Sequence, residues 1–189
     1  MASRPPRIAP LKREDAAPQV EAMYRRMEAM GNSPPNMHLT FGKNPGLYEK
    51  WLPFATYIIP ASSLGHRDRQ ILILRSAFKW QCGYVWSQHV RISRFFAALS
   101  DQEIAALCND GTDESWSPTE RALIAAVDET RTVGEISDPV WKVLAVRYGE
   151  DQLLDLVFTI GQYALISTAL RSLRVQLDGG FSLPDWAAI

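Results

Sequence analysis

The chain has 189 residues, of which 47% are hydrophobic and 22% charged, and its 20 Lys and Arg residues against 21 Asp and Glu residues leave a formal net charge of −1. This length and composition are typical of one globular domain that buries a full core. The balance lacks the basic excess of nucleic-acid-binding proteins, so we expect no nucleic-acid partner.

Three features indicate the compartment. No apolar run approaches the ~20 residues that span a bilayer. A secretory signal has an apolar block after its charged N-terminal residues, and the segment Met-Ala-Ser-Arg-Pro-Pro-Arg is not followed by one. The two cysteines, Cys82 and Cys108, are too few for a disulfide scaffold. We therefore expect a cytoplasmic protein with no membrane partner.

The first part of the chain predicts an arm followed by helices. Residues 1–16 are rich in Pro, Arg and Ala without periodicity, which predicts an arm over the surface or over a neighbouring subunit, and residues 17–189 form one domain. Apolar residues at helical spacing predict a first helix that ends at Gly31. A short helix follows, through His38 and Phe41.

Asn44 before Pro45 predicts the start of a third helix, since asparagine caps helices and proline suits the first helical position. Pro60 ends it. The positions expected on its buried side are Trp51, Phe54, Ala55 and Ile58.

The segment from Leu64 to Leu99 predicts two helices that meet at Cys82-Gly83, where glycine permits a tight turn. Four residues follow at i, i+3, i+4 and i+7 and share one face of the second helix: Cys82, Val85, Trp86 and His89. We therefore expect the Cys82 thiol and the His89 imidazole to point into the same space. A cysteine at a helix N-terminus is expected to have a lowered pKa.

Capping signals mark the later helices. Ser100 with Glu103 and Ser117 with Glu120 each form the capping-box pattern, and a polar loop, Asn109 to Asp113, lies between them. A further helix opens at Ser137-Asp138-Pro139 and closes at Gly149.

The last helix is predicted from Asp151 to about Leu177, ended by Gly179-Gly180. It is apolar around much of its circumference, so its excess apolar face, with that of the central hairpin, is a natural subunit interface. No segment reads as a strand, and the sequence predicts an all-α fold.

The run from Arg69 to Arg75, followed by Cys82-Gly-Tyr-Val-Trp-Ser-Gln-His89, resembles the signature hairpin of the carboxymuconolactone decarboxylase family, which includes the alkyl hydroperoxidase D proteins. The resemblance implies an alkyl hydroperoxidase D-like helical fold and a homo-oligomer, as trimers or hexamers.

The chain departs from the redox members of that family at two positions. They carry C-x-x-C-x-x-x-H with a Glu nineteen positions before the His, whereas Val85 replaces the second Cys here and Gln70 the Glu. A dithiol needs two sulfurs and a proton relay needs a titratable carboxyl, so both parts of the peroxidase machinery are incomplete. Tyr84, Trp86 and His89 match the Tyr-x-Trp-x-x-His of the decarboxylase-like members.

Three hypotheses of function follow. The first is a cofactor-independent lyase, similar to a lactone decarboxylase in aromatic-compound catabolism, that acts on a small carboxylated or aromatic-derived molecule with His89 as general acid and base. The second is a thiol peroxidase of peroxiredoxin type, or a redox sensor, that uses Cys82. The third is a non-catalytic protein that binds a ligand in the same pocket.

Each of the remaining candidate residues has a role that these hypotheses assign to it, and for Trp86 and Arg75 a purely structural role is the alternative. Tyr84 or Gln70 would orient the substrate, and Gln70 can hydrogen-bond His89 and fix its tautomer. Trp86 would form an aromatic wall or pack in the core. Arg75 would hold a substrate carboxylate or form a structural salt bridge. The three histidines have no metal-ligand spacing, so no metal site is predicted.

Overall fold

A computed structural model describes residues 4–96, 98–109 and 115–187. In these ranges the chain is helical, and none of the described residues lies in a strand. The helices are α1 (Pro18–Ala29), α2 (Asn36–Phe41), α3 (Pro45–Thr56), α4 (His66–Lys79), α5 (Gly83–Phe95), α6 (Asp101–Ala106), α7 (Pro118–Val133), α8 (Asp138–Arg147) and α9 (Glu150–Leu173). The all-α prediction is confirmed.

The capping residues start the helices where the sequence predicts. The Asn44 side chain accepts a hydrogen bond from the Leu47 amide at 3.1 Å. Ser100 and Ser117 each complete a capping box with the glutamate three positions on. The predicted polar loop from Asn109 to Asp113 falls mostly outside the described residues.

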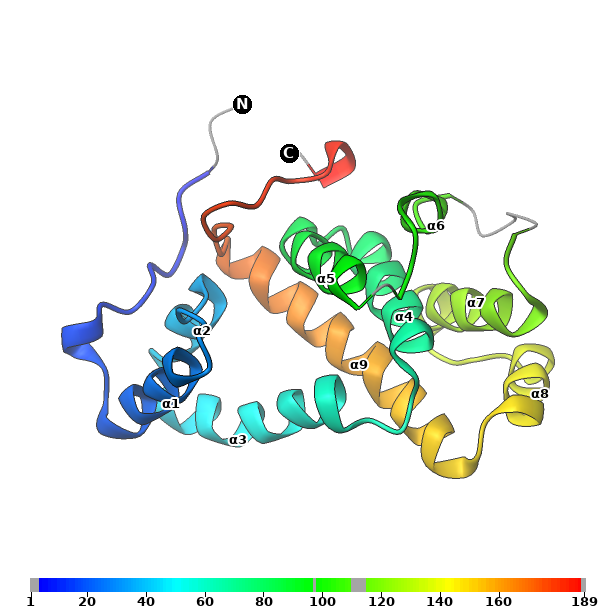
Figure 1. Ribbon diagram of the computed structural model, residues 1–189, viewed down its shortest axis with the longest axis horizontal. Helices are drawn as coiled ribbons and strands as arrows, with labels where there is room; N and C mark the ends of the chain where they lie inside the picture. The colour runs from blue at the N-terminus through cyan, green and yellow to red at the C-terminus, as the bar shows by residue number, and fades with distance from the viewer. Residues whose placement is uncertain (1–3, 97, 110–114, 188–189) are drawn as a thin grey trace.

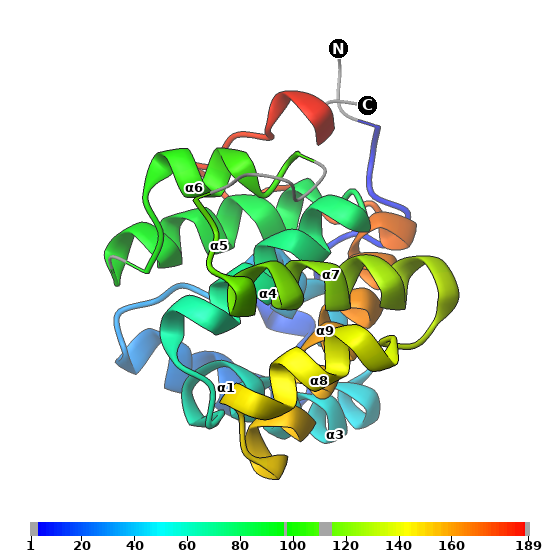
Figure 2. The same ribbon diagram turned by 90° about the vertical axis from the view of Figure 1, so that its right-hand side faces the viewer.

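The core forms around α4. This helix packs against α5, α7 and α9, and its residues from Arg69 to Ala77 are all buried. Figures 1 and 2 show α4 and α9 in the middle of the molecule, with α1, α2 and α3 forming a separate group to one side of them. A π-helical turn, η2 (Tyr57–Ala61), connects that group to the core and contacts α9.

Three helix boundaries differ from the prediction. Helix α3 ends at Thr56, and the chain continues as the π-helical turn η2, which contains Pro60. Helix α9 ends at Leu173, because Arg174 adopts the left-handed conformation (φ 55°) before either glycine is reached. At the hairpin corner the left-handed residue is Gln81 (φ 54°), and Gly83 is already the first residue of α5.

Phe54, which we expected on the buried side of α3, is 37% exposed.

Gly83 has a packing role in place of the predicted turn role. A Cβ atom there would lie 2.5 Å from Leu183 Cδ2 and 2.8 Å from Ala187 Cβ. These residues belong to the C-terminal segment, residues 175–187, which crosses α5 and ends in the 3-10 helix η3 (Asp185–Ala187). The Ser87 hydroxyl donates to the Ser182 carbonyl at 2.7 Å and holds the segment in place.

The N-terminal arm lies over the surface near the end of α9. The Arg7 amide donates to the Leu173 carbonyl at 2.9 Å, and the Leu11 amide donates to the Leu39 carbonyl at 3.1 Å. The arm therefore connects the C-terminal end of α9 to α2.

Helix α9 is long and apolar enough to cross a membrane, with a mean hydropathy of 1.5 over an 18-residue window. The expectation that no segment reaches this length is wrong, because the small polar residues that interrupt the apolar run lower its hydropathy only slightly. The protein itself buries 56% of that window, as it would for the core helix of a globular domain.

Candidate functional site

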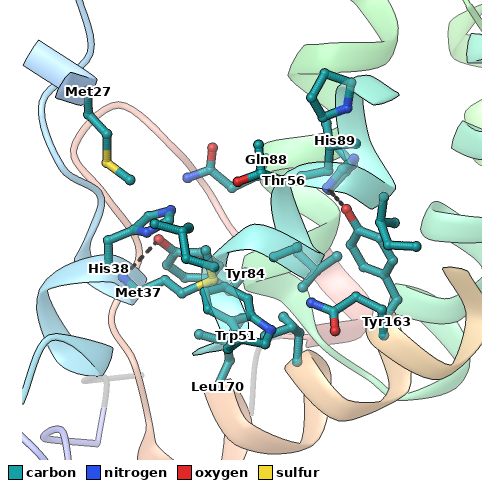
Figure 3. A pocket seen from close by; sticks show the side chains of 18 residues that line it. Met27, Met37, His38, Trp51, Thr56, Tyr84, Gln88, His89, Tyr163 and Leu170 are labelled. Carbon is teal, nitrogen blue, oxygen red and sulfur yellow. Dashed lines mark hydrogen bonds between the residues drawn. The ribbon is translucent and has the colours of Figure 1, made fainter. Parts of the chain in front are cut away.

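A cavity of about 280 Å³ lies between the α1–α3 group and the core helices α5 and α9 (Figure 3). Most of its walls are apolar. Its polar lining side chains come from four helices: His38, Trp51, Thr56, Tyr84, Gln88, His89, Gln162 and Tyr163. None of the cavity-lining residues of the described chain is Asp, Glu, Lys or Arg.

His89 is held between two side chains. Its Nδ1 lies 3.1 Å from Gln70 Oε1. Its Nε2 lies 2.9 Å from the Tyr163 hydroxyl (Figure 3). The carbonyl oxygen of Gln70 can only accept, so Nδ1 carries the ring proton and donates it. Nε2 is then the acceptor of the Tyr163 O–H. The predicted bond between Gln70 and His89 is present and fixes this tautomer.

Burial keeps the His89–Tyr163 pair uncharged. Desolvation, and secondly the positive charge of Arg69, lower the pKa of His89 to about 3. Desolvation raises the pKa of Tyr163 above its ordinary value. Since Gln70 replaces a carboxylate at this position, no negative charge on that side of the ring favours the imidazolium. At neutral pH the pair is a neutral imidazole and a neutral phenol.

Arg69 lies behind this pair, outside the cavity lining. It is 3% exposed, and it donates to the Leu64 carbonyl at 3.0 Å and contacts His66 Nδ1 at 2.9 Å. Its charge lowers the pKa of both His89 and Tyr163. A buried cation whose charge acts on both groups favours negative charge at the His89 end of the cavity.

Tyr84 lines the cavity and belongs to a second polar cluster. Its hydroxyl donates to Asp178 at 2.5 Å. It accepts from the Met37 amide at 3.3 Å (Figure 3). Asp178 also accepts from Gln88 at 2.8 Å and from the Asn36 amide at 2.6 Å. This carboxylate connects the C-terminal segment to α2 and α5, so the Tyr84 hydroxyl is already committed to structure.

Cys82 does not share the space of His89. It caps α5, as predicted, but it is 1% exposed and is absent from the cavity lining, whereas Val85 lines the cavity one turn further on. Burial raises the pKa of the Cys82 thiol, and this outweighs the amides of Val85 and Tyr84 and the hydroxyl of Ser167, which lower it. The expected lowering of this pKa is therefore wrong.

Trp86 and Arg75 also lie outside the cavity lining. The Trp86 ring packs edge-on against Trp186 of the C-terminal segment, with ring centroids 5.4 Å apart. Arg75 is 1% exposed and forms a bidentate salt bridge with Asp128, through contacts of 2.8 and 2.5 Å. It also donates to the Leu107 carbonyl at 2.7 Å. Both residues occupy the structural alternatives, and neither is placed to bind a substrate in this cavity.

The sequence did not single out His38 or Tyr163. Tyr163 lies in an apolar stripe of α9, where its spacing is that of any core residue, and His38 stands alone in a short helix. Among the residues that the structure describes, no group of three His, Cys, Asp or Glu side chains could hold a metal ion.

Comparison with solved structures identifies the fold. An uncharacterised peroxidase-related protein from Ralstonia eutropha JMP134, described as an alkylhydroperoxidase AhpD core, superposes with a TM-score of 0.79 at 13% identity over 93% of this chain and 94% of that one. A putative antioxidant defence protein AhpD from Agrobacterium tumefaciens gives 0.67 at 21% identity, over 73% and 94%. The fold is thus alkylhydroperoxidase-like.

The debrominase Bmp8, in a complex of its cysteine-to-alanine variant with 2,3,4-tribromopyrrole, superposes with a TM-score of 0.74 at 20% identity over 91% of both chains. A comparison with curated protein sequences gives no significant match. Residues 45–129 match the carboxymuconolactone decarboxylase family. This region contains α4 and α5, so the match confirms the resemblance of the central hairpin to this family.

Proposed function

We propose that this protein is a cofactor-independent enzyme that transfers a proton at a carbon atom of a small, uncharged, aromatic-derived or lactone-type molecule. The observation that carries the proposal is the His89–Tyr163 pair on the wall of an uncharged cavity. The match of residues 45–129 to the family and the likeness to a debrominase and to AhpD-like proteins support an enzymatic role in general.

The uncharged lining narrows the substrate class. A carboxylate moved into an apolar cavity loses its hydration and needs a cation or several donors in return. Arg75, the residue expected to supply that cation, is bonded to Asp128 away from the cavity. Of the two substrate classes that the sequence left open, the aromatic-derived, uncharged class fits this cavity better than the carboxylated class.

The pair can move a proton without a charged resting state. A proton leaves the substrate carbon for the Tyr163 oxygen while the phenol proton passes to His89 Nε2. The electron pair of the C–H bond stays on the substrate as an enolate, and the imidazole becomes imidazolium. Arg69 favours the negative charge that develops on the reacting carbon, and burial makes the imidazolium a strong acid that returns the proton by the same route, at the same or a conjugated carbon.

The test is exchange of carbon-bound hydrogen in D₂O, which requires no knowledge of the product. Small lactones and cyclic ketones are incubated with the protein, and deuterium incorporation is followed by NMR. We expect exchange with the wild type and a loss of about 100-fold or more in His89→Gln and Tyr163→Phe, the usual contribution of general acid–base catalysis. His66→Gln, at an exposed histidine outside the cavity, is the control. Equal exchange in wild type and His89→Gln would contradict the proposal.

The thiol peroxidase is the second candidate, because AhpD-like proteins share the fold. It requires a reactive thiolate, whereas the Cys82 thiol is buried with a raised pKa and a valine stands at the cavity wall. We expect no dimedone adduct on Cys82 after treatment with hydrogen peroxide. An adduct that disappears in Cys82→Ser would favour this function over proton transfer.

A further inference from the structure

The cavity contains a second imidazole, His38, which the proton-transfer scheme does not use. His38 lies in α2 and reaches the cavity from the α1–α3 group, whereas His89 reaches it from α5. Figure 3 shows the two side chains apart from each other, with Gln88 and Thr56 between them. The cavity therefore has two ends, each with one histidine.

The His38 ring is fixed by aromatic neighbours. Its Nδ1 lies 2.7 Å from the hydroxyl of Tyr48, which is fully buried. The rings of Tyr48 and Trp51 pack at centroid distances of 5.8 and 6.3 Å. The Tyr24 hydroxyl donates to the His38 backbone carbonyl at 3.0 Å. Backbone and ring are both held, so the other ring nitrogen has a defined direction.

The contact with Tyr48 also sets the tautomer. His38 Nδ1 is the one hydrogen-bond partner of the Tyr48 hydroxyl among the described residues. A buried O–H left without an acceptor costs free energy, so Tyr48 donates to Nδ1. Desolvation lowers the pKa of His38 to about 4, against the opposing charge of Asp178, so the ring is neutral at pH 7. A neutral ring that accepts at Nδ1 carries its proton on Nε2.

The two histidines therefore differ in what they offer a ligand. Both ring nitrogens of His89 are bonded to protein, to Gln70 and Tyr163. His38 Nε2 has no protein partner in the described residues, so a ligand can accept its proton without breaking an internal bond. Two more lining side chains contain a buried polar atom without a partner, the Trp51 indole nitrogen and the Gln162 carbonyl oxygen.

We propose that His38 is a substrate-binding residue that donates a hydrogen bond from Nε2 to a carbonyl or lactone oxygen of the bound molecule, and that Tyr48 is the residue that positions it. This inference rests on the proposed function. It adds to that function a hydrogen-bond donor for the oxygen of the enolate. The ligand lies with its acceptor oxygen at the His38 end and its reacting carbon at the His89–Tyr163 end.

The test compares two neutral ligands of the same shape. Phthalide is a bicyclic aromatic lactone, and indane has the same ring skeleton without oxygen. Binding of each is measured by NMR titration for the wild type, His38→Phe and Tyr48→Phe. The matched control is Tyr24→Phe. This variant removes the hydrogen bond to the His38 backbone carbonyl and leaves the contacts of the His38 ring in place.

We expect His38→Phe to weaken phthalide binding about 10-fold, the size of a neutral hydrogen bond in an apolar site, and to change indane binding less than about twofold. Tyr24→Phe is expected to leave the preference for phthalide unchanged. Phthalide that does not bind the wild type, or equal effects of His38→Phe on the two ligands, would overturn the proposal.

The ¹⁵N resonances provide a second measurement that needs no stable variant, because the chain has three histidines. We expect the proton of His38 on Nε2 and that of His89 on Nδ1, and a shift of His38 Nε2 on addition of phthalide but not of indane. In Tyr48→Phe the His38 tautomer is expected to become mixed. A His38 ring with its proton on Nδ1 in the wild type rules the proposal out.

These measurements also separate the two proposals. If the lactones show no exchange in D₂O but phthalide binds through His38, proton transfer fails and the binding role remains. If exchange depends on His89, but the His38→Phe variant binds both ligands as the wild type does, the binding role of His38 is wrong and the proton-transfer proposal remains.

Discussion

At the scale of single residues, the burial of His89 makes the protein sensitive to acid. The folded protein holds His89 neutral, with a pKa of about 3, whereas the unfolded chain binds a proton at the ordinary pKa of about 6.5. The contribution to stability is thus complete above pH 6.5 and is lost as the pH falls toward 3. We expect the free energy of unfolding to fall by about 1.4 kcal/mol per pH unit from this group. Urea unfolding at several pH values measures the slope, which should decrease in His89→Gln.

The variant Gln70→Glu tests the cause of the low pKa. A carboxylate hydrogen-bonded to Nδ1 favours the imidazolium, so we expect the pKa of His89 to rise and the acid-dependent loss of stability to become smaller. NMR titration of the imidazole measures the shift. An unchanged pKa in a folded Gln70→Glu protein would show that burial alone, and not the missing carboxylate, keeps the ring neutral.

At the scale of the elements, Arg75 connects α4 to α7 and to the chain that follows α6. Arg75→Ala leaves the Leu107 carbonyl without this donor and Asp128 with Lys79 Nζ at 3.4 Å in place of a bidentate partner, and breaking a buried pair costs about 3 kcal/mol or more. The exposed pair Arg94–Asp101, in contact at 2.7 Å, is the matched control, and its loss should cost about 1 kcal/mol or less. Urea unfolding measures both. Equal costs would contradict the structural role of Arg75.

Gly83 connects α5 to the C-terminal segment. Since an alanine Cβ would lie 2.5 Å from Leu183, we expect Gly83→Ala to displace this segment and increase its cleavage by protease. Gly46→Ala is the control, because that glycine is exposed in the first turn of α3 and its Cβ position has only Asn44 Oδ1 nearby, at 3.8 Å, so the change should stabilise the helix by up to about 1 kcal/mol. Unchanged cleavage in Gly83→Ala would show that the segment packs differently.

The local signals in the sequence predicted most helix starts and fewer of the helix ends. Asn44, Ser100 and Ser117 act through hydrogen bonds to their own first turns, so their neighbours in the sequence suffice to identify them. The end of α9 at Arg174 is a left-handed residue without the usual glycine, and the space around Gly83 is filled by residues 100 positions away. Neither depends on local sequence.

In the candidate site, too, contacts between residues close in the sequence could be predicted, and contacts between distant residues could not. The pairing of Gln70 with His89 could be predicted, because both residues belong to one hairpin. Tyr163 comes from α9, 74 positions beyond His89, and His38 comes from the other side of the cavity. In the sequence Tyr163 has the pattern of a core residue, and no periodicity marks His38. The expectation that Cys82 and His89 point into the same space was wrong, because a helix face is wider than one cavity.

At the scale of the whole molecule, an apolar surface on α9 is left exposed. Leu154, Phe158 and Leu165 lie on one side of the helix with exposures of 61%, 54% and 56%. Phe158 contacts Phe54 of α3 edge-on, with ring centroids 6.0 Å apart, and this extends the surface to the outer wall of the cavity. An apolar stripe of this kind on a helix is typical of a subunit interface.

We expect the protein to be a homo-oligomer, a trimer or a hexamer, that buries this surface. The double variant Leu154→Glu/Leu165→Glu places charges on the stripe and should convert the oligomer to single chains, as measured by size-exclusion chromatography with light scattering. Val146→Glu is the matched control, since Val146 is 90% exposed but lies on α8, outside the stripe. A wild type that elutes as a single chain would contradict the prediction, and so would an oligomer that both variants leave intact. Because α3 forms part of both the stripe and the cavity wall, the single chain should also bind phthalide more weakly than the oligomer.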